Sequence, residues 1–161
     1  MDYNKLIGNQ DYPFGEMSPG QFILGLLSEF DNRYQACADA FFGEITWKQF
    51  FAIICIKLCN GNPTVNELSD VMGSSHQNVK QILLKLEKKG MVRITEDKSD
   101  RRKQRICLTQ ACEEFCRVND SAGAEIIGRI FEGIPEKSII EAIKVIGRMD
   151  ANLKKMEGKI K

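Results

Sequence analysis

The chain has 161 residues, of which 43% are hydrophobic and 28% are charged, and its formal net charge is +1. A chain of this size forms one domain, or one small domain with helical extensions. No apolar run approaches the roughly 18–20 residues that a membrane-spanning helix needs, and the acidic N-terminal segment lacks the apolar stretch of a signal peptide. We therefore expect a cytoplasmic protein whose six cysteines are free thiols rather than a disulfide framework.

The charged residues are unevenly distributed along the chain. Residues 1–73 carry 4 basic and 9 acidic side chains, a net charge of −5, and residues 106–161 carry 9 of each. Residues 74–105 carry 10 basic and 4 acidic side chains, a net charge of +6. A positive block in a nearly neutral chain is typical of a face that binds a polyanion, although a solvated lysine-rich surface gives the same counts.

Two helices are predicted before this block. Ser18 and Gln21 have the spacing of a capping box, and so do Thr46 and Gln49, so that a helix is expected after each serine or threonine. The apolar stripe expected for the first helix is Phe22, Leu26, Phe30, Ala36 and Ala40. The stripe expected for the second is Trp47, Phe50, Phe51, Ile54 and Leu58. This second, aromatic-rich helix is expected to form the core.

Two shorter helices separated by a tight turn are predicted next. Thr64 and Glu67 repeat the capping-box spacing, Gly73 suits the left-handed end of a helix, and either Ser74 or Ser75 can cap the helix that follows. One face of that following helix consists of Val79, Ile82, Leu83 and Leu86. The opposite face consists of Gln77, Lys80, Gln81, Lys85 and Lys88, together with the apolar Leu84. Glutamine and lysine are among the side chains that hydrogen-bond base edges and phosphates.

A basic hairpin and two more helices complete the predicted elements. Residues 91–96 and 104–109 alternate apolar and polar side chains as two strands, and four of the five residues 101–105 are basic. Thr109 can cap a long helix that breaks at residues 133–135, and a last helix is expected to end near Gly158. The stripe of that last helix is Ile139, Ile143, Ile146, Leu153 and Met156.

A helix, a tight turn, a second helix and a basic hairpin form a winged helix-turn-helix. Asp100-Arg101-Arg102, followed after five residues by Leu108-Thr109, resembles the D-x-R…L-T wing signature of the multiple antibiotic resistance regulator (MarR) family. The resemblance covers residues 64–109 and implies a mainly α fold with a small β wing. It implies a single domain over residues 1–161, in which residues 18–60 and 110–158 supply helices for the core and for dimerisation, and residues 64–109 bind DNA.

The resemblance further implies a homodimer that binds a pseudo-palindromic operator in double-stranded DNA. The recognition helix would enter the major groove and the wing the minor groove, where Arg102 would insert, while Asp100 would hold the wing in shape by pairing with an arginine. The DNA-binding residues expected on the helix and the wing are Ser75, His76, Gln77, Asn78, Lys80, Gln81, Lys85, Arg101, Arg102 and Lys103. The leading interpretation is a transcriptional repressor released by a small-molecule effector.

Two alternatives to this interpretation stay open. One is a thiol-based redox regulator that uses Cys37, Cys55 or Cys59, and the other is a winged-helix interaction module without an operator of its own. We expect no metal site, because the C-x2-C spacing is absent and His76 is the only histidine. We expect no cofactor and no enzymatic activity, because the sequence contains no nucleophile elbow, Walker loop or dinucleotide fingerprint.

Overall fold

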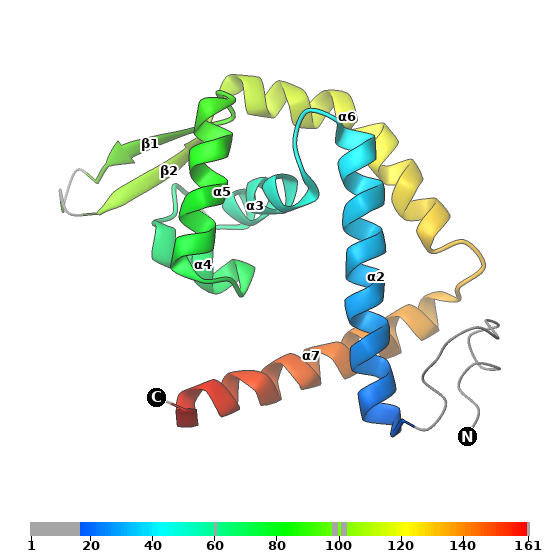
Figure 1. The fold of residues 1–161 in the computed structure, drawn as a ribbon. Helices are drawn as coiled ribbons and strands as arrows, with labels where there is room; N and C mark the ends of the chain where they lie inside the picture. Colours follow the sequence, from blue (N-terminus) through cyan, green and yellow to red (C-terminus); the bar gives the residue numbers. More distant parts are fainter. Residues whose placement is uncertain (1–16, 60, 98–99, 101–102, 161) are drawn as a thin grey trace. The chain divides into compact units, whose positions relative to one another are not determined.

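The computed structural model describes residues 17–160, apart from residues 60, 98–99 and 101–102. Within these residues the chain forms six helices and one two-stranded sheet (Figure 1). The elements are α2 (Pro19–Phe42), α3 (Trp47–Leu58), α4 (Val65–Met72), α5 (His76–Lys88), β1 (Val92–Glu96), β2 (Gln104–Leu108), α6 (Gln110–Ile130) and α7 (Glu136–Ile160). The chain divides into two compact units, Met1–Cys116 and Arg117–Lys161, which are described separately. The mainly α fold with a small β wing is confirmed.

Capping boxes begin three of the helices in the first unit. Ser18 caps α2 together with Gln21, and Thr46 caps α3 in the same way. Thr64 accepts a hydrogen bond from the backbone N–H of Glu67 at the start of α4, and the Glu67 carboxylate accepts one from the Thr64 N–H at 2.7 Å. Each box pairs backbone donors that the helix leaves unsatisfied. All three predicted helix starts are confirmed.

The α4–α5 turn and the wing follow the predicted pattern closely. Gly73 ends α4 with φ of 59°, a left-handed conformation that glycine adopts without strain. Ser75, one of the two predicted caps, begins α5 by accepting a hydrogen bond from the N–H of Asn78 at 3.3 Å. The strands β1 and β2 pair antiparallel, with Ile94 opposite Ile106. Thr109 then accepts a hydrogen bond from the N–H of the third residue of α6 and begins that helix.

The core of the first unit lies among α3, α4, α5 and the wing. The predicted apolar face of α5 is buried in full, and Leu68 of α4 and Ile106 of β2 are inaccessible to solvent. The stripe predicted for α3 is wrong in part, since Leu58 at its end is 69% exposed. The most deeply buried residues of α3 are Ala52, Ile53, Cys55 and Ile56. The reason is that α3 packs against α2, α4, α5 and β2 and is therefore enclosed on more than one side.

The stripe predicted for α2 is also wrong in its second half. Phe30 is 53% exposed, and Ala36 and Ala40 are exposed as well. Tyr34, Ala38 and Phe42, spaced four residues apart, continue the inner face instead. The ring of Tyr34 lies 4.5 Å from that of Trp47, and the ring of Phe42 lies 4.3 Å from that of Phe50. Aromatic contacts with α3 therefore decide which side of α2 faces inward.

The second unit contains the larger part of α6, from Arg117 onward, and the whole of α7. The two helices are separated by Gly133, whose φ is 73°. In α7 the predicted stripe carries several apolar side chains that are open to solvent, among them Ile143 at 64% and Leu153 at 56% exposure. Of the helices in the described part of the chain, none has both the length and the apolar character needed to cross a membrane.

Candidate nucleic-acid interface

The polar face of α5 is the first part of the candidate interface. Because four apolar side chains on one side of α5 are buried in the core, the opposite side faces away from that core. The side chains predicted to contact DNA are all exposed on this helix and its cap: Ser75, His76, Gln77, Asn78, Lys80, Gln81 and Lys85. Two of them also have structural partners, since Ser75 caps the helix and the Asn78 amide donates to Ser74 Oγ at 2.8 Å.

The tip of the wing is the second part. Lys103 is exposed, and its ammonium lies 4.0 Å from a carboxylate oxygen of Asp100. The Asp100 N–H donates to Oδ1 of Asp97 at 3.1 Å. Arg101 and Arg102 lie outside the described residues. Two roles therefore stay predictions: the contact of Arg102 with the minor groove, and the pairing of Asp100 with an arginine.

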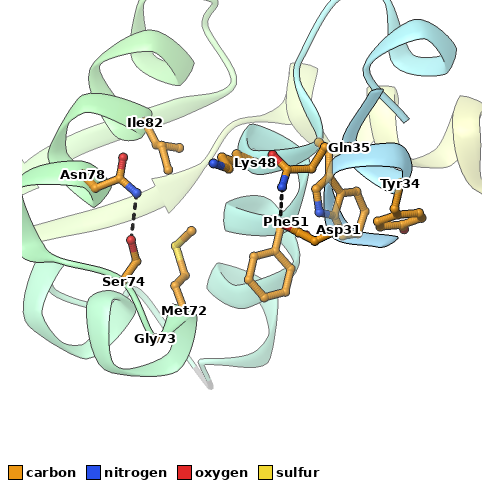
Figure 2. Close-up of a pocket in the computed structure, with 11 residues that line it drawn as sticks. Asp31, Tyr34, Gln35, Lys48, Phe51, Met72, Gly73, Ser74, Asn78 and Ile82 are labelled. Carbon is orange, nitrogen blue, oxygen red and sulfur yellow. Dashed lines mark hydrogen bonds between the residues drawn. The ribbon is translucent and has the colours of Figure 1, made fainter. Parts of the chain in front are cut away.

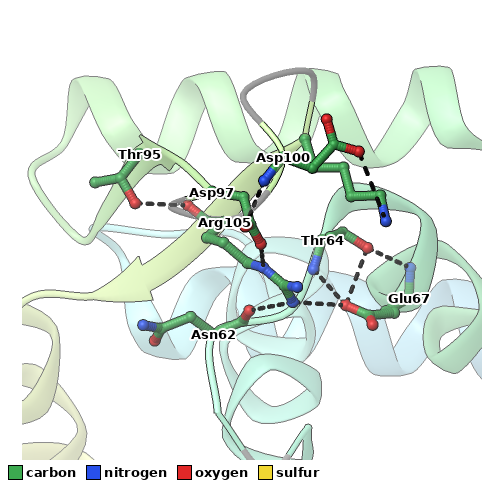
Figure 3. A network of polar contacts seen from close by, with 8 residues as sticks. Asn62, Thr64, Glu67, Thr95, Asp97, Asp100 and Arg105 are labelled. Carbon is green, nitrogen blue, oxygen red and sulfur yellow. Dashed lines mark hydrogen bonds and ion pairs between the residues drawn. The ribbon is translucent and has the colours of Figure 1, made fainter.

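Arg105 joins the wing to the helix-turn-helix, and this role was missed in the sequence (Figure 3). Its Nε donates to Oδ2 of Asp97 at 2.5 Å, a carboxylate whose side chain is only 8% exposed. Its Nη1 donates to the carbonyl oxygen of Asn62 at 3.1 Å and to the carboxylate of Glu67 at 3.4 Å. The strand alternation predicts an outward Arg105, and this is only half correct, because the side chain folds back across the hairpin.

The charges in this network reinforce one another. The hydrogen bond from Arg105 to Asp97 raises the pKa of the guanidinium above its ordinary value. Hydrogen bonds from Thr64 lower the pKa of the Glu67 carboxyl, and the positive charge of Arg105 lowers it further. Glu67 is therefore ionised at neutral pH, and it caps α4 while it receives the guanidinium. The opposite charges of Asp97 and Arg105 within the hairpin were visible in the sequence, but the partners at Asn62 and Glu67 were not.

Backbone hydrogen bonds attach the wing at the same place. The N–H of Ile106 donates to the carbonyl oxygen of Pro63 at 2.9 Å, and Thr64 forms an isolated β-bridge with Arg105. On the other side of the hairpin, the carboxylate of Glu87 in α5 accepts the N–H of Ile94 at 3.1 Å. The wing is thus connected to both helices of the helix-turn-helix.

A groove of about 310 Å³ lies between the wing and these helices. The start of α4 forms one side of it, and basic side chains from α5 and the wing form much of the remainder. These basic residues are Lys80, Lys103 and Arg105, with His76 beside them. The carboxylate of Glu67 also lines the groove, but the cationic side chains outnumber it, and polar and cationic side chains are those that contact phosphates.

Comparison with known proteins identifies this arrangement. Residues 45–103 match the model of the MarR family, and the match runs from the start of α3 through the helix-turn-helix to the tip of the wing. The helix-turn-helix and the wing of this chain are therefore similar to those of the MarR family.

Solved structures share the fold over most of the chain. A MarR protein from Peptoclostridium difficile DA00132 is 20% identical, with 86% of this chain and 92% of that chain covered and a TM-score of 0.76. The organohalide-sensing regulator RdhR in its 2,4-dichlorophenol-bound form is 12% identical, with 88% and 85% covered and a TM-score of 0.77. BpsR of Bordetella bronchiseptica, whose DNA binding is regulated by 6-hydroxynicotinic acid, is 14% identical, with 80% and 98% covered and a TM-score of 0.66.

The chain also has a pocket of about 520 Å³ next to the start of α5 (Figure 2). Three segments of the first unit line it, with aromatic, amide and charged side chains. The lining residues are Asp31, Tyr34 and Gln35 of α2, Trp47, Lys48 and Phe51 of α3, and Met72, Gly73, Ser74, Asn78 and Ile82 from the α4–α5 region. Burial raises the pKa of Tyr34, so its hydroxyl is protonated at neutral pH. Aromatic rings beside polar side chains suit a small organic ring compound.

The three cysteines considered for redox sensing lie in different environments. Cys37 is exposed, Cys55 is buried, and Cys59 is intermediate. Burial, with a smaller contribution from the neighbouring Cys59, raises the pKa of the Cys55 thiol. Because the thiolate is the reactive form, the environment of Cys55 disfavours oxidation. Among the described residues, no three His, Cys, Asp or Glu side chains are grouped so that they could hold a metal ion.

Proposed function

We propose that the chain is a homodimeric repressor that binds a pseudo-palindromic DNA operator and releases it when a small organic ligand binds. The observation that carries this proposal is the exposed polar face of α5 beside a basic wing. The wing is held to the helix-turn-helix by the contacts of Arg105.

The α5 face supports direct reading of bases in the major groove. Its 13 residues give a helix about 20 Å long, and the major groove admits one α-helix. Gln77 and Gln81 can hydrogen-bond adenine through two atoms at once. Lys80 and Lys85 lie on either side of them and would contact the phosphates that flank the groove.

The exposed apolar side chains of α7 support a dimer. Ile143, Ile146 and Leu153 are each at least 45% exposed and fall within one side of the helix. A stripe of this kind is stabilised when a second copy covers it, because burial removes apolar surface from water. Two copies related by a twofold axis would present two α5 helices, and the half-sites would be about one DNA turn apart.

The pocket supports release by a ligand. Asn78 belongs to the first turn of α5 and also lines the pocket, so a bound molecule would touch the recognition helix directly. Regulation requires only that the ligand bind the DNA-free arrangement more tightly than the DNA-bound one. The solved relatives named with 2,4-dichlorophenol and 6-hydroxynicotinic acid suggest small ring compounds of this class as the first ligands to test.

The test is selection of operators from a random duplex library, followed by affinity measurements at fixed salt. We expect a palindrome, and a loss of about 1–3 kcal/mol in the Gln81→Ala variant on that sequence, with relaxed preference at one position. The matched control is Lys137→Ala, an exposed change in α7, which should leave affinity unchanged. If no palindrome emerges, the chain is an interaction module and the proposal is wrong.

The ligand part is tested in the same assay. Small phenols and hydroxylated aromatic acids are added to the preformed complex, and the Phe51→Ala variant serves as the comparison because it removes one wall of the pocket. We expect such a compound to weaken operator binding by the wild type and to have less effect on the variant. Equal release of both proteins would place the effector elsewhere.

A further inference from the structure

Leu84 is the residue of α5 that neither the fold nor the proposed function explains. Its side chain is 54% exposed, whereas its neighbour Leu83 is 1% exposed and belongs to the core. Successive residues of a helix are rotated by about 100°. Leu84 therefore points almost directly away from the buried face, between Gln77 and Gln81 of the preceding turns and Lys88 of the next.

An apolar side chain at this position cannot take part in the hydrogen bonds that its neighbours can form. Isolated leucines are common on protein surfaces, but this one lies at the centre of the face proposed to enter the major groove. Of the four bases, only thymine presents an apolar group there, its 5-methyl group. Leu84 could therefore contact the thymine methyl, while the amides and ammonium groups around it contact the neighbouring hydrogen-bonding atoms and phosphates.

We propose that Leu84 is a specificity-determining residue that packs against the 5-methyl group of a thymine in each half-site. This inference rests on the proposed function, since it requires α5 to lie in the major groove. Contact with the methyl removes both apolar surfaces from water, and cytosine at that position would leave Leu84 facing an amino group. Gln81, one turn earlier on the same face, would read a base close to this thymine.

The expected effect follows from the size of the contact. Burial of one methyl group changes an equilibrium constant by about fourfold. A dimer that occupies two equivalent half-sites should therefore show about a 15-fold change when both contacts are removed, if the two sites are independent.

The experiment replaces thymines of the selected operator with deoxyuridine, symmetrically in both half-sites and one position at a time. Deoxyuridine keeps every hydrogen-bonding group of thymine and lacks the methyl. For the wild-type protein, we expect one position at which the change weakens binding about 15-fold. Leu84→Ala should bind the unmodified operator about as weakly, and it should lose sensitivity at that position. Affinities are measured by fluorescence anisotropy at one salt concentration.

Lys85→Ala is the matched control, because Lys85 is the next residue on the same exposed side of the helix. Lys85→Ala should weaken binding to the unmodified and the deoxyuridine operator by the same factor. The ratio of the two affinities should therefore stay that of the wild type. Thermal unfolding of Leu84→Ala should match the wild type, which separates a contact with DNA from a folding defect.

Two results would overturn the inference while the proposed function survived. One is a palindrome whose every thymine position gives the same deoxyuridine response with wild type and Leu84→Ala. The other is a Leu84→Ala variant that changes the sedimentation of the protein without DNA, which would place Leu84 in a protein contact. Failure of the wild type to select any palindrome would overturn both.

Discussion

At the scale of single residues, Arg105 is the side chain that joins the wing to several separate groups. It donates to a nearly buried carboxylate, to a backbone carbonyl and to the residue that caps α4. These three acceptors come from the hairpin, from the α3–α4 loop and from α4 itself. A planar guanidinium can bond several acceptors in different directions, which a single ammonium group does less well. Arg105 therefore acts by positioning the wing, and it need not touch DNA to affect DNA binding.

We predict that Arg105→Lys lowers both the Tm and the operator affinity, although the net charge is unchanged. The lysine cannot reach Asp97, Asn62 and Glu67 together, so the buried Asp97 carboxylate loses part of its compensation. The measurements are thermal unfolding and anisotropy with the selected operator. Arg93→Lys, an exposed change on the neighbouring strand, is the control and should change neither property. Equal behaviour of the two variants would show that charge alone matters.

At the scale of the element, α5 combines two faces with different physical roles. Its apolar face is buried against the core and determines where the helix lies, whereas its polar face remains available to a partner. Leu83 and Leu84 are adjacent in the chain and chemically identical, yet one is buried and the other is half exposed. This pair separates the contribution of the helix to stability from its contribution to recognition.

We predict that Leu83→Ala lowers the free energy of unfolding by about 2–5 kcal/mol, because it leaves a cavity in the core. Leu84→Ala should change it by no more than about 0.5 kcal/mol, as expected of a surface substitution. Urea denaturation at one fixed protein concentration measures both, since the stability of a dimer depends on concentration. A large loss in Leu84→Ala would mean that this side chain is covered in the folded protein.

At the scale of the whole molecule, the distribution of apolar surface differs between the two units. The first unit has an enclosed core built from α3, α4, α5 and the sheet. In α7 of the second unit, many large apolar side chains are open to solvent. A long amphipathic helix with its apolar side exposed gains little from folding alone. The proposed association with a second copy would therefore stabilise this unit.

We predict that the wild type sediments as a dimer of the 18.2 kDa chain and that the double variant Ile143→Asp, Ile146→Asp sediments as a monomer. Two carboxylates in an apolar interface would be desolvated without partners. Operator affinity should fall in the double variant, because a monomer holds a single half-site. Lys144→Gln, a polar change on the same helix turn, is the control. A double variant that stays dimeric would move the interface away from this stripe.

The sequence by itself determined the elements that depend on local interactions. Capping boxes at Ser18, Thr46 and Thr64, the glycine at position 73 and the repeat of apolar residues in α5 all depend on neighbours within one or two helical turns. The resemblance of the wing signature also identified the family that residues 45–103 match. These features could be predicted because their physical causes lie within a few positions of one another in the chain.

The tertiary structure decided which faces are buried and which distant groups meet. The inner face of α2 was set by the ring of Trp47 against Tyr34, and α3 was buried around more of its circumference than one stripe suggests. Arg105 contacts Glu67 and Asn62, which lie some forty residues earlier in the chain. At this separation in sequence, the periodicity of apolar residues carries no information about contacts. Contacts of this kind depend on how helices and strands pack, and packing is a property of the whole fold rather than of any segment.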